Sequence, residues 1–138
     1  MTTRNNNAYN IFLAKHVRND TPINEDMAAW KRFFSHNQNL CNRPTQSFLR
    51  YNDKSLINNV CTSNGGKIYE RNLCISNRTF SFITVRIKQG CEISSITRET
   101  NHIILACDKI DNVCRPVHFE GNQNNLKPNP KAPGCQYH

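Results

Sequence analysis

One stretch decides the fold of this chain: residues 75–87 read ISNRTFSFITVRI and mix aromatic and β-branched residues with serine and threonine. This composition favours a long β-strand. Three later runs, residues 92–100, 102–107 and 115–120, have a similar character and are separated by turn-forming residues. The second half of the chain therefore predicts an antiparallel sheet.

The first half of the chain predicts helices. The apolar residues of segment 9–17 fall on one helical face, and His16 lies beside them. Asn24 is placed to cap a second helix, and residues 53–60 form a third that begins at Asp53. The inner side of the second helix consists of Met27, Trp30 and Phe34. Helices followed by antiparallel strands indicate the α+β class.

Length and charge limit the possible functions. The chain has 138 residues, which allow one domain, residues 1–121, followed by a tail, residues 122–138, rich in proline and asparagine. We expect this tail to be extended and mobile. The net charge is +8, so the chain is expected to bind a polyanion such as nucleic acid, an anionic membrane surface or glycans. No run of the sequence approaches the roughly 20 apolar residues that a membrane-spanning helix needs.

Seven cysteines indicate a secreted protein cross-linked by disulfides. None of them forms a CxxC pair, which zinc knuckles and thioredoxin-like redox sites require. The segment Asn77-Arg78-Thr79 is an N-glycosylation sequon and agrees with secretion. Residues 1–7 lack the apolar segment of a signal peptide, so we expect a mature secreted chain. The odd number leaves at least one cysteine outside intramolecular disulfides, or joined to a second molecule.

Three short motifs carry the residues suited to chemistry. They are FLAKH at residues 12–16, CNRPTQSF at residues 41–48 and RPVHFE at residues 115–120. Taken alone, each has a structural explanation, because a single histidine among apolar residues is most often a core or surface residue. For Arg43 alone, the corresponding structural explanation is a solvated surface charge. The order of the three motifs along the chain is more specific than any one of them.

This order resembles the pancreatic-type ribonuclease superfamily, including its angiogenin-like branch. FLAKH is similar to the end of the family's first helix, which carries a catalytic histidine, and CNRPTQSF is similar to its Cys-Lys-Pro-x-Asn-Thr-Phe segment if Asn42 is a one-residue insertion. PVHFE, residues 116–120, is similar to its Pro-Val-His-Phe-Asp motif, and NHIILAC, residues 101–107, to the preceding strand. The resemblance covers residues 8–121 and implies three short helices packed on a curved antiparallel sheet.

The resemblance also implies disulfides. Two of the family's bridges map onto this chain as Cys41–Cys91 and Cys61–Cys107. A third family bridge falls at Met27 and Val85, so it is lost here as a unit and we expect apolar packing in its place.

Three cysteines have no common counterpart in the family. On the family fold Cys74 and Cys114 would lie close together, so we expect a Cys74–Cys114 disulfide that leaves Cys135 in the tail. The alternative is Cys114–Cys135, which leaves Cys74 outside any bridge.

The mechanism that the resemblance implies uses the 2′-hydroxyl of RNA as the nucleophile. His16 would accept the hydroxyl proton, and His118 would protonate the departing 5′-oxygen. Arg43 stands where the family has a lysine and would stabilise the negative transition state. Arginine is larger and planar, so we expect weak activity. Glu120 would hold the His118 ring.

The resemblance assigns further residues to substrate binding. Ser47 stands at the family's pyrimidine-reading threonine, and a hydroxyl beside a backbone N–H suits cytosine and uracil alike. Asn72 and Asp108 map to the pocket for the base on the 3′ side. Lys15 adds positive charge near the phosphate, and Phe119 contributes to the core and to the wall of the active site. No cofactor or metal is implied.

Two functions of different classes follow. The first is a secreted, monomeric endoribonuclease of low activity that cleaves single-stranded RNA on the 3′ side of pyrimidines. The second is a secreted cationic protein with angiogenic or antimicrobial action, which keeps the fold and works by binding cells, glycans or membranes. Two histidines favour the enzyme, whereas Arg43 and the insertion of Asn42 favour the alternative. The cysteine content disfavours an intracellular nucleic-acid-binding regulator.

Overall fold

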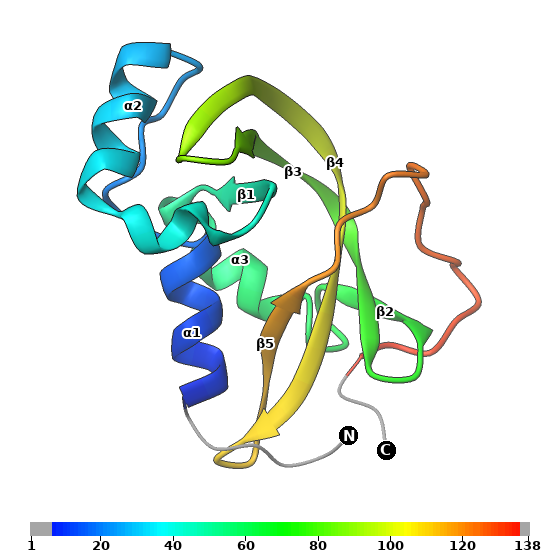
Figure 1. Cartoon of the computed structure of the whole chain (residues 1–138). Coiled ribbons are helices and arrows are strands. Elements are labelled where there is room, and N and C mark those ends of the chain that lie inside the picture. The colour runs from blue at the N-terminus through cyan, green and yellow to red at the C-terminus, as the bar shows by residue number, and fades with distance from the viewer. Residues whose placement is uncertain (1–6, 136–138) are drawn as a thin grey trace.

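A curved antiparallel sheet forms the body of the molecule, and three α-helices pack around it (Figure 1). The computed structural model describes residues 7–135. Its α-helices are α1 (Asn7–His16), α2 (Met27–His36) and α3 (Lys54–Asn59), and its strands are β1 (Thr45–Leu49), β2 (Gly66–Glu70), β3 (Leu73–Lys88), β4 (Glu92–Ile110) and β5 (Val113–Phe119). The predicted α+β class is therefore confirmed. None of the helices in the described range is long and apolar enough to cross a membrane.

The sheet is built on the hairpin of β3 and β4, whose pairing runs from Leu73↔Ala106 to Lys88↔Glu92. β1 and β2 both pair with β3, near its opposite ends, and β5 pairs with β4. The two separate strands expected over 92–100 and 102–107 are thus one continuous strand. Gly66 is the first residue of β2. A Cβ at Gly66 would lie 1.9 Å from the Val60 carbonyl oxygen, so this close approach requires glycine.

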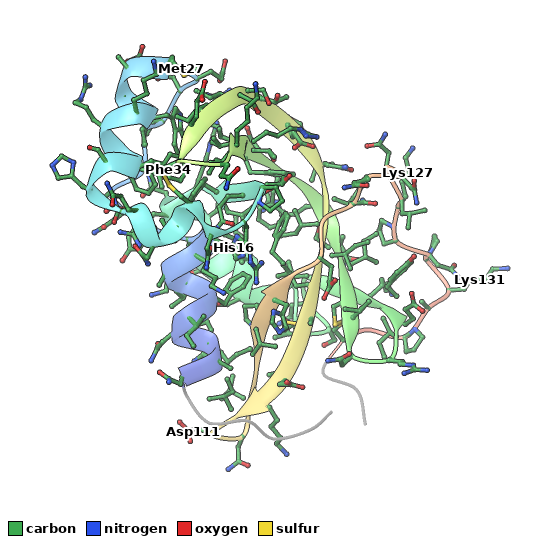
Figure 2. All side chains as sticks on the ribbon, in the orientation of Figure 1. His16, Met27, Phe34, Asp111, Lys127 and Lys131 are labelled. Atoms are coloured by element: carbon green, nitrogen blue, oxygen red, sulfur yellow. A yellow bond between two sulfur atoms is a disulfide. The ribbon has the colours of Figure 1, made fainter. Side chains whose placement is uncertain are left out.

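An aromatic cluster holds α2 against the sheet. Trp30 is fully buried, and its ring centroid lies 5.1 Å from that of Phe48 on β1. Val85, also fully buried, belongs to the same cluster, whereas Met27 at the start of α2 is 39% exposed (Figure 2). The apolar packing expected in place of the missing family disulfide therefore surrounds Val85, but Met27 is not part of it.

The N-terminus of α2 is capped by Asp26, whose carboxylate accepts a hydrogen bond from the Ala29 N–H at 3.2 Å. The expected cap, Asn24, lies two residues earlier, and its carbonyl oxygen accepts a hydrogen bond from the Trp30 indole at 2.7 Å. The prediction of Asn24 as the cap was wrong, because the nearer carboxylate of Asp26 satisfies the Ala29 N–H in the first turn of the helix.

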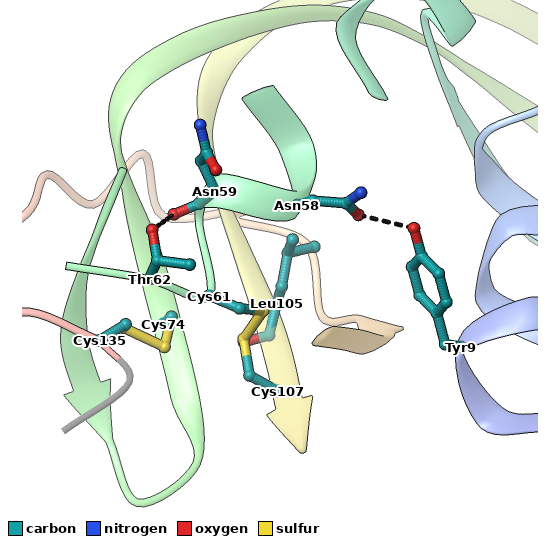
Figure 3. Close-up of a disulfide and its surroundings, with 9 residues drawn as sticks. All are labelled: Tyr9, Asn58, Asn59, Cys61, Thr62, Cys74, Leu105, Cys107 and Cys135. Carbon is teal, nitrogen blue, oxygen red and sulfur yellow. Dashed lines mark hydrogen bonds between the residues drawn. A yellow bond between two sulfur atoms is a disulfide. The ribbon is translucent and has the colours of Figure 1, made fainter. Parts of the chain in front are cut away.

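A second cluster lies between α1, α3 and the other half of the sheet. Phe12 of α1 and Ile57 of α3 are both buried in it. The two helices are also joined directly, since the Tyr9 hydroxyl donates to the Asn58 side-chain oxygen at 3.1 Å (Figure 3). α1 in turn packs against β5 and β1, which places the C-terminal end of this helix at the edge of the sheet.

Three disulfides cross-link the described chain. They are Cys41–Cys91, Cys61–Cys107 and Cys74–Cys135. The expected Cys74–Cys114 bridge and its alternative, Cys114–Cys135, are both wrong. The Cys114 sulfur lies within 4.8 Å of the Cys61 and Cys107 sulfurs, whereas Cys135 comes back to Cys74 on β3 (Figure 3). Burial and the negative charge of Asp108 raise the pKa of the Cys114 thiol to about 11.

The C-terminal tail is extended, as expected, but it is bonded to the body of the molecule. After β5 it descends past β2 (Figure 1), where the Cys135 N–H donates to Gly66 and the Pro133 carbonyl accepts from Ile68. Near its start the Asn122 side chain donates to the His102 carbonyl at 3.0 Å. The tail is thus attached at both ends, and residues 136–138 lie outside the described part of the chain.

Removing the tail disulfide should destabilise the protein. We expect Cys135→Ala to lower the free energy of unfolding by about 2–4 kcal/mol, because the bridge closes a long loop of the unfolded chain. Urea unfolding measures the change. Cys114→Ala, which keeps all three disulfides, is the matched control and should cost less. A non-reducing peptide map that joined Cys74 to Cys114 would contradict the pairing.

Candidate active site

His16, the last residue of α1, lies where this helix meets β1 (Figure 2). Its ring is 5% exposed, and its Nδ1 lies 2.8 Å from the carbonyl oxygen of Ser47. A carbonyl oxygen only accepts hydrogen bonds, so in the neutral ring Nδ1 carries the proton and donates it. Nε2 then carries the lone pair. This is the arrangement of a base that is ready to accept a proton.

Burial governs the charge of His16. Loss of hydration lowers its pKa to about 4, although the hydrogen bond to Ser47 acts in the opposite direction. The positive charges of Arg43, Lys15 and His118 lower the pKa further. The ring is packed against Phe119 at 5.4 Å between centroids. His16 is therefore neutral at physiological pH.

A polar cavity of about 210 Å³ opens beside His16. Residues from several elements form its walls. They come from the end of α1, from strands β1, β3 and β4, from Arg43 just before β1, and from the end of β5 with the segment that follows it. The residues are His16, Arg43, Thr45, Ser47, Phe82, Thr84, Arg86, Glu99, Asn101, Phe119, Glu120, Gly121, Asn122 and Gln123. This cavity is the candidate active site.

Four of the other predicted site residues line the same cavity as His16: Arg43, Ser47, Phe119 and Glu120. Arg43 follows a short 3-10 helix, Gln38–Asn42, whose Cys41 is joined by a disulfide to Cys91. The suggested insertion, Asn42, is the last residue of this helix, so the extra residue is taken up before the strand begins. Arg43 itself is exposed.

Two predicted residues lie near this cavity without lining it. His118 on β5 is exposed and stands opposite Ala106 of β4, and half-buried Lys15 precedes His16 in the chain. Both are close enough for their charges to lower the pKa of His16. Within residues 7–135 no hydrogen bond or ion pair joins Glu120 to His118. The expected support of the His118 ring is thus missing; the Glu120 N–H bonds the Ile104 carbonyl of β4 at 2.9 Å, and the Glu120 side chain is exposed.

Asn72 and Asp108, expected to form the pocket for the second base, are not brought to this cavity. Asn72 is exposed, and its carbonyl oxygen accepts from the Cys107 N–H at 2.9 Å. Asp108 pairs with Arg115 in the ladder of β4 and β5, and its side chain is fully buried. A fully buried carboxylate has no surface to offer a base, so for Asp108 the expectation was wrong.

The structure adds site residues that the motifs did not indicate. Phe82, Thr84 and Arg86 alternate along β3 and therefore share the face that lines the cavity. The Thr84 hydroxyl lies 2.9 Å from the Ser47 hydroxyl and donates to the carboxylate of Glu99 on β4. The alternation of side chains along β3 could have shown that these three residues share one face. The position of Glu99 beside Thr84, in contrast, depends on how β3 and β4 are aligned.

The start of the tail closes one side of the cavity. Gly121, Asn122 and Gln123 line it, and Asn101 of β4 holds this segment by donating to the Asn122 carbonyl at 3.0 Å. Nothing in the local sequence indicated this contact, because it joins residues 21 positions apart.

Metal binding is not indicated in the described part of the chain. The group of potential ligands there consists of Cys61, Cys107 and Cys114, whose sulfurs lie within 4.8 Å of one another. Cys61 and Cys107 are joined in a disulfide and have no thiolate to offer.

The arrangement suits proton transfer beside a negatively charged group. A neutral imidazole presents an accepting nitrogen next to a cavity whose wall includes the guanidinium groups of Arg43 and Arg86. Such fixed cations favour an anion and stabilise charge that develops on it. The hydroxyls of Ser47 and Thr84 and the carboxylate of Glu99, which line the same cavity, suit a polar, hydrogen-bonding group of the same ligand.

The solved structures that resemble this chain include two ribonucleases. The X-ray structure of SS-RNase-2 des116-120 is 26% identical, with a TM-score of 0.60, over 84% of this chain and 98% of its own. The crystal structure of green turtle egg white ribonuclease is 23% identical, with a TM-score of 0.64, over 82% of this chain and 96% of its own. No family model and no curated protein matches the chain. Both structures confirm the predicted fold.

The low pKa of His16 should appear in the pH dependence of stability. In the unfolded chain histidine titrates near 6.5, so between this pH and about 4 the unfolded state binds a proton that the folded state does not. Above pH 6.5 the titration of His16 therefore costs no stability. As the pH falls below this value, it lowers the free energy of unfolding, by about 3 kcal/mol at pH 4.

His16→Phe is the matched control, because it keeps an aromatic ring and removes the titrating group. We expect its free energy of unfolding, measured by urea denaturation, to fall less steeply than that of the wild type between pH 6.5 and 4. Parallel curves for the two proteins would refute the depressed pKa.

Proposed function

Because the chain belongs to the pancreatic-type ribonuclease superfamily, we propose that it is an endoribonuclease that cleaves single-stranded RNA on the 3′ side of pyrimidines. The observation that carries the proposal is the neutral, buried His16, whose Nδ1–H is held by Ser47 and whose Nε2 is left to accept a proton. Its place in a cavity lined by arginine supports RNA as the substrate.

In the proposed reaction His16 Nε2 removes the proton of the 2′-hydroxyl. The 2′-oxygen attacks the adjacent phosphorus, the bond to the 5′-oxygen of the next nucleotide breaks, and a 2′,3′-cyclic phosphate forms. His118 gives its proton to the departing 5′-oxygen, so one proton is taken up and one is released. The exposed position of His118, within electrostatic reach of His16, supports this assignment.

The negative charge of the transition state is stabilised by Arg43. Its guanidinium lines the cavity and lowers the pKa of His16, so it acts on the space where the phosphate would lie. Arg86 lines the same cavity and adds a second positive charge. A planar guanidinium presents its charge differently from the compact ammonium of lysine. This difference supports a modest rate of RNA cleavage.

The base on the 5′ side is read by Ser47. Its hydroxyl lines the cavity, and its carbonyl is already bonded to His16, so the base and the catalytic nitrogen are placed by one residue. The three disulfides support secretion into an oxidising compartment. The chain's place in an angiogenin-like branch stays a prediction.

The alternative function is that of a secreted cationic protein that binds cells, glycans or membranes. One observation favours it: His118 lacks the contact with Glu120 that would orient its ring, which weakens the case for an efficient acid. The net charge of +8 supports binding to polyanions in either case.

The enzyme is tested with a fluorogenic pyrimidine–purine dinucleotide. We expect His16→Ala and His118→Ala each to lower kcat/KM by roughly 10²–10⁴-fold, because each removes one proton-transfer group. Arg43→Lys should raise the rate, since it restores the compact cation. Lys131→Ala, an exposed change far out on the tail (Figure 2), is the control and should leave the rate unchanged.

Wild-type cleavage no faster than that of the His16→Ala/His118→Ala double variant would refute the enzyme. Binding to cells or permeabilisation of membranes that survives in the double variant would then point to the alternative.

A further inference from the structure

Three sulfur atoms meet in the buried cluster between α3 and strands β4 and β5. Cys61 and Cys107 are joined in a disulfide (Figure 3), and the Cys114 sulfur lies within 4.8 Å of both of their sulfurs. Cys114 keeps its thiol, and all three residues are at most 2% exposed. A thiol in this position is a nucleophile beside a bond that it can break.

Burial limits what the Cys114 thiol can react with. A thiol or an oxidant dissolved in water has almost no access to a side chain that is 2% exposed. The sulfurs of the other two bridges do not belong to the group around Cys114. The Cys61–Cys107 disulfide is therefore the reaction partner that the fold supplies.

Strand register indicates which sulfur of this disulfide Cys114 can bond to. Cys107 of β4 stands opposite Pro116, and Cys114 stands opposite Lys109, so the two cysteines are diagonal neighbours on one face of the ladder. Diagonal residues lie about 7–8 Å apart, whereas the Cα atoms of a disulfide lie roughly 4.4–6.8 Å apart. A Cys107–Cys114 bridge would therefore require two paired strands to move.

Cys61 is placed differently. It lies in the turn between α3 and β2, outside any strand, so its position is not fixed by a ladder. A bridge from Cys61 to Cys114 would close a loop only seven residues longer than the present one. Because loop-closure entropy grows slowly with length, the two bridges constrain the unfolded chain almost equally. Cys61 is thus the sulfur that Cys114 can bond to at least cost.

We propose that Cys114 is the internal nucleophile of a disulfide exchange that moves this bridge from β4 to β5. The Cys114 thiol gives its proton to the solvent, and the thiolate attacks the Cys61 sulfur. A Cys61–Cys114 bond forms as the Cys61–Cys107 bond breaks. The electron pair of the broken bond leaves with Cys107, which then takes up a proton. No oxidant or reductant is consumed, and the inference does not depend on the proposed function.

The surroundings of Cys114 restrain this exchange at neutral pH. Burial and the negative charge of Asp108 raise the pKa of the thiol to about 11, so only about one molecule in ten thousand carries the thiolate at pH 7. Lys109 stands opposite Cys114 on β4, Arg115 follows it on β5, and the α3 residue buried in the same cluster, Ile57, is uncharged. Because only the thiolate attacks, alkaline pH should start the exchange.

The test follows which cysteine carries the thiol. The protein is held at alkaline pH, quenched with acid, unfolded and labelled with N-ethylmaleimide, and trypsin, which cuts after Lys109, then separates Cys107 from Cys114. We expect the label to move with time from Cys114 to Cys107 and a Cys61–Cys114 peptide to appear. Its rate should rise about 100-fold from pH 8 to pH 10 and should not depend on protein concentration.

Cys114→Ala is the matched control, because it removes the nucleophile and keeps all three disulfides. This variant should take up no label and should keep the same bridges at every pH. The Cys41–Cys91 and Cys74–Cys135 bridges are internal controls in the wild type and should stay intact. The wild-type time course decides the question even if Cys114→Ala folds poorly.

Three results would overturn the inference. The first is label that stays at Cys114 at every pH, and the second is label that appears at Cys61 in place of Cys107 or spreads over all the cysteines. The third is a rate that grows with protein concentration, because this is the mark of exchange between molecules.

Discussion

The hydrogen bond from His16 Nδ1 to the Ser47 carbonyl connects the parts on which the site depends. It joins the end of α1 to the edge strand β1 at 2.8 Å, in a place where the imidazole is almost fully buried. A buried imidazole N–H and a buried carbonyl oxygen both need a hydrogen-bonding partner, and here they bond to each other. The same bond fixes the tautomer of His16. One hydrogen bond therefore both holds the end of α1 against β1 and decides which ring nitrogen carries the proton.

The sheet provides the second requirement, which is the register of its strands around the site. Because Ser47 stands opposite Thr84, and β3 pairs with β4 without a shift from Thr79 to Arg86, groups from three strands meet in one wall. The aromatic cluster around Trp30 holds this end of the sheet against α2 without the disulfide that a family relative would have there. The groups that we propose for catalysis and for base binding therefore share one supporting sheet.

Much of the fold was predictable from the sequence, because its signals are local. α1 follows from the spacing of its apolar residues, α3 begins directly after Asp53, where the sequence predicted its start, and β3 follows from a long run of β-branched and aromatic residues. β1 was not identified because four of its five residues are buried, which leaves no alternation to detect. The attachment of the tail and the Cys74–Cys135 bridge depend on contacts between distant residues, which no local pattern encodes.

The residues of the candidate site were likewise predictable where they lie in short motifs and not where they meet through distant contacts. His16, Arg43 and Phe119 stand in short motifs and could be identified, whereas Thr84 and Glu99 become neighbours of Ser47 only through strand register. Asp108 was misassigned because a motif position does not reveal that a side chain points into the core.

The central claim is that His16 is a neutral base with its proton on Nδ1. Nitrogen-15 NMR of the histidine rings tests it directly. We predict a protonated Nδ1 and a bare Nε2 at pH 7, with a transition to the charged ring near pH 4. A proton on Nε2 at pH 7, or a transition near the ordinary histidine value of about 6.5, would contradict it.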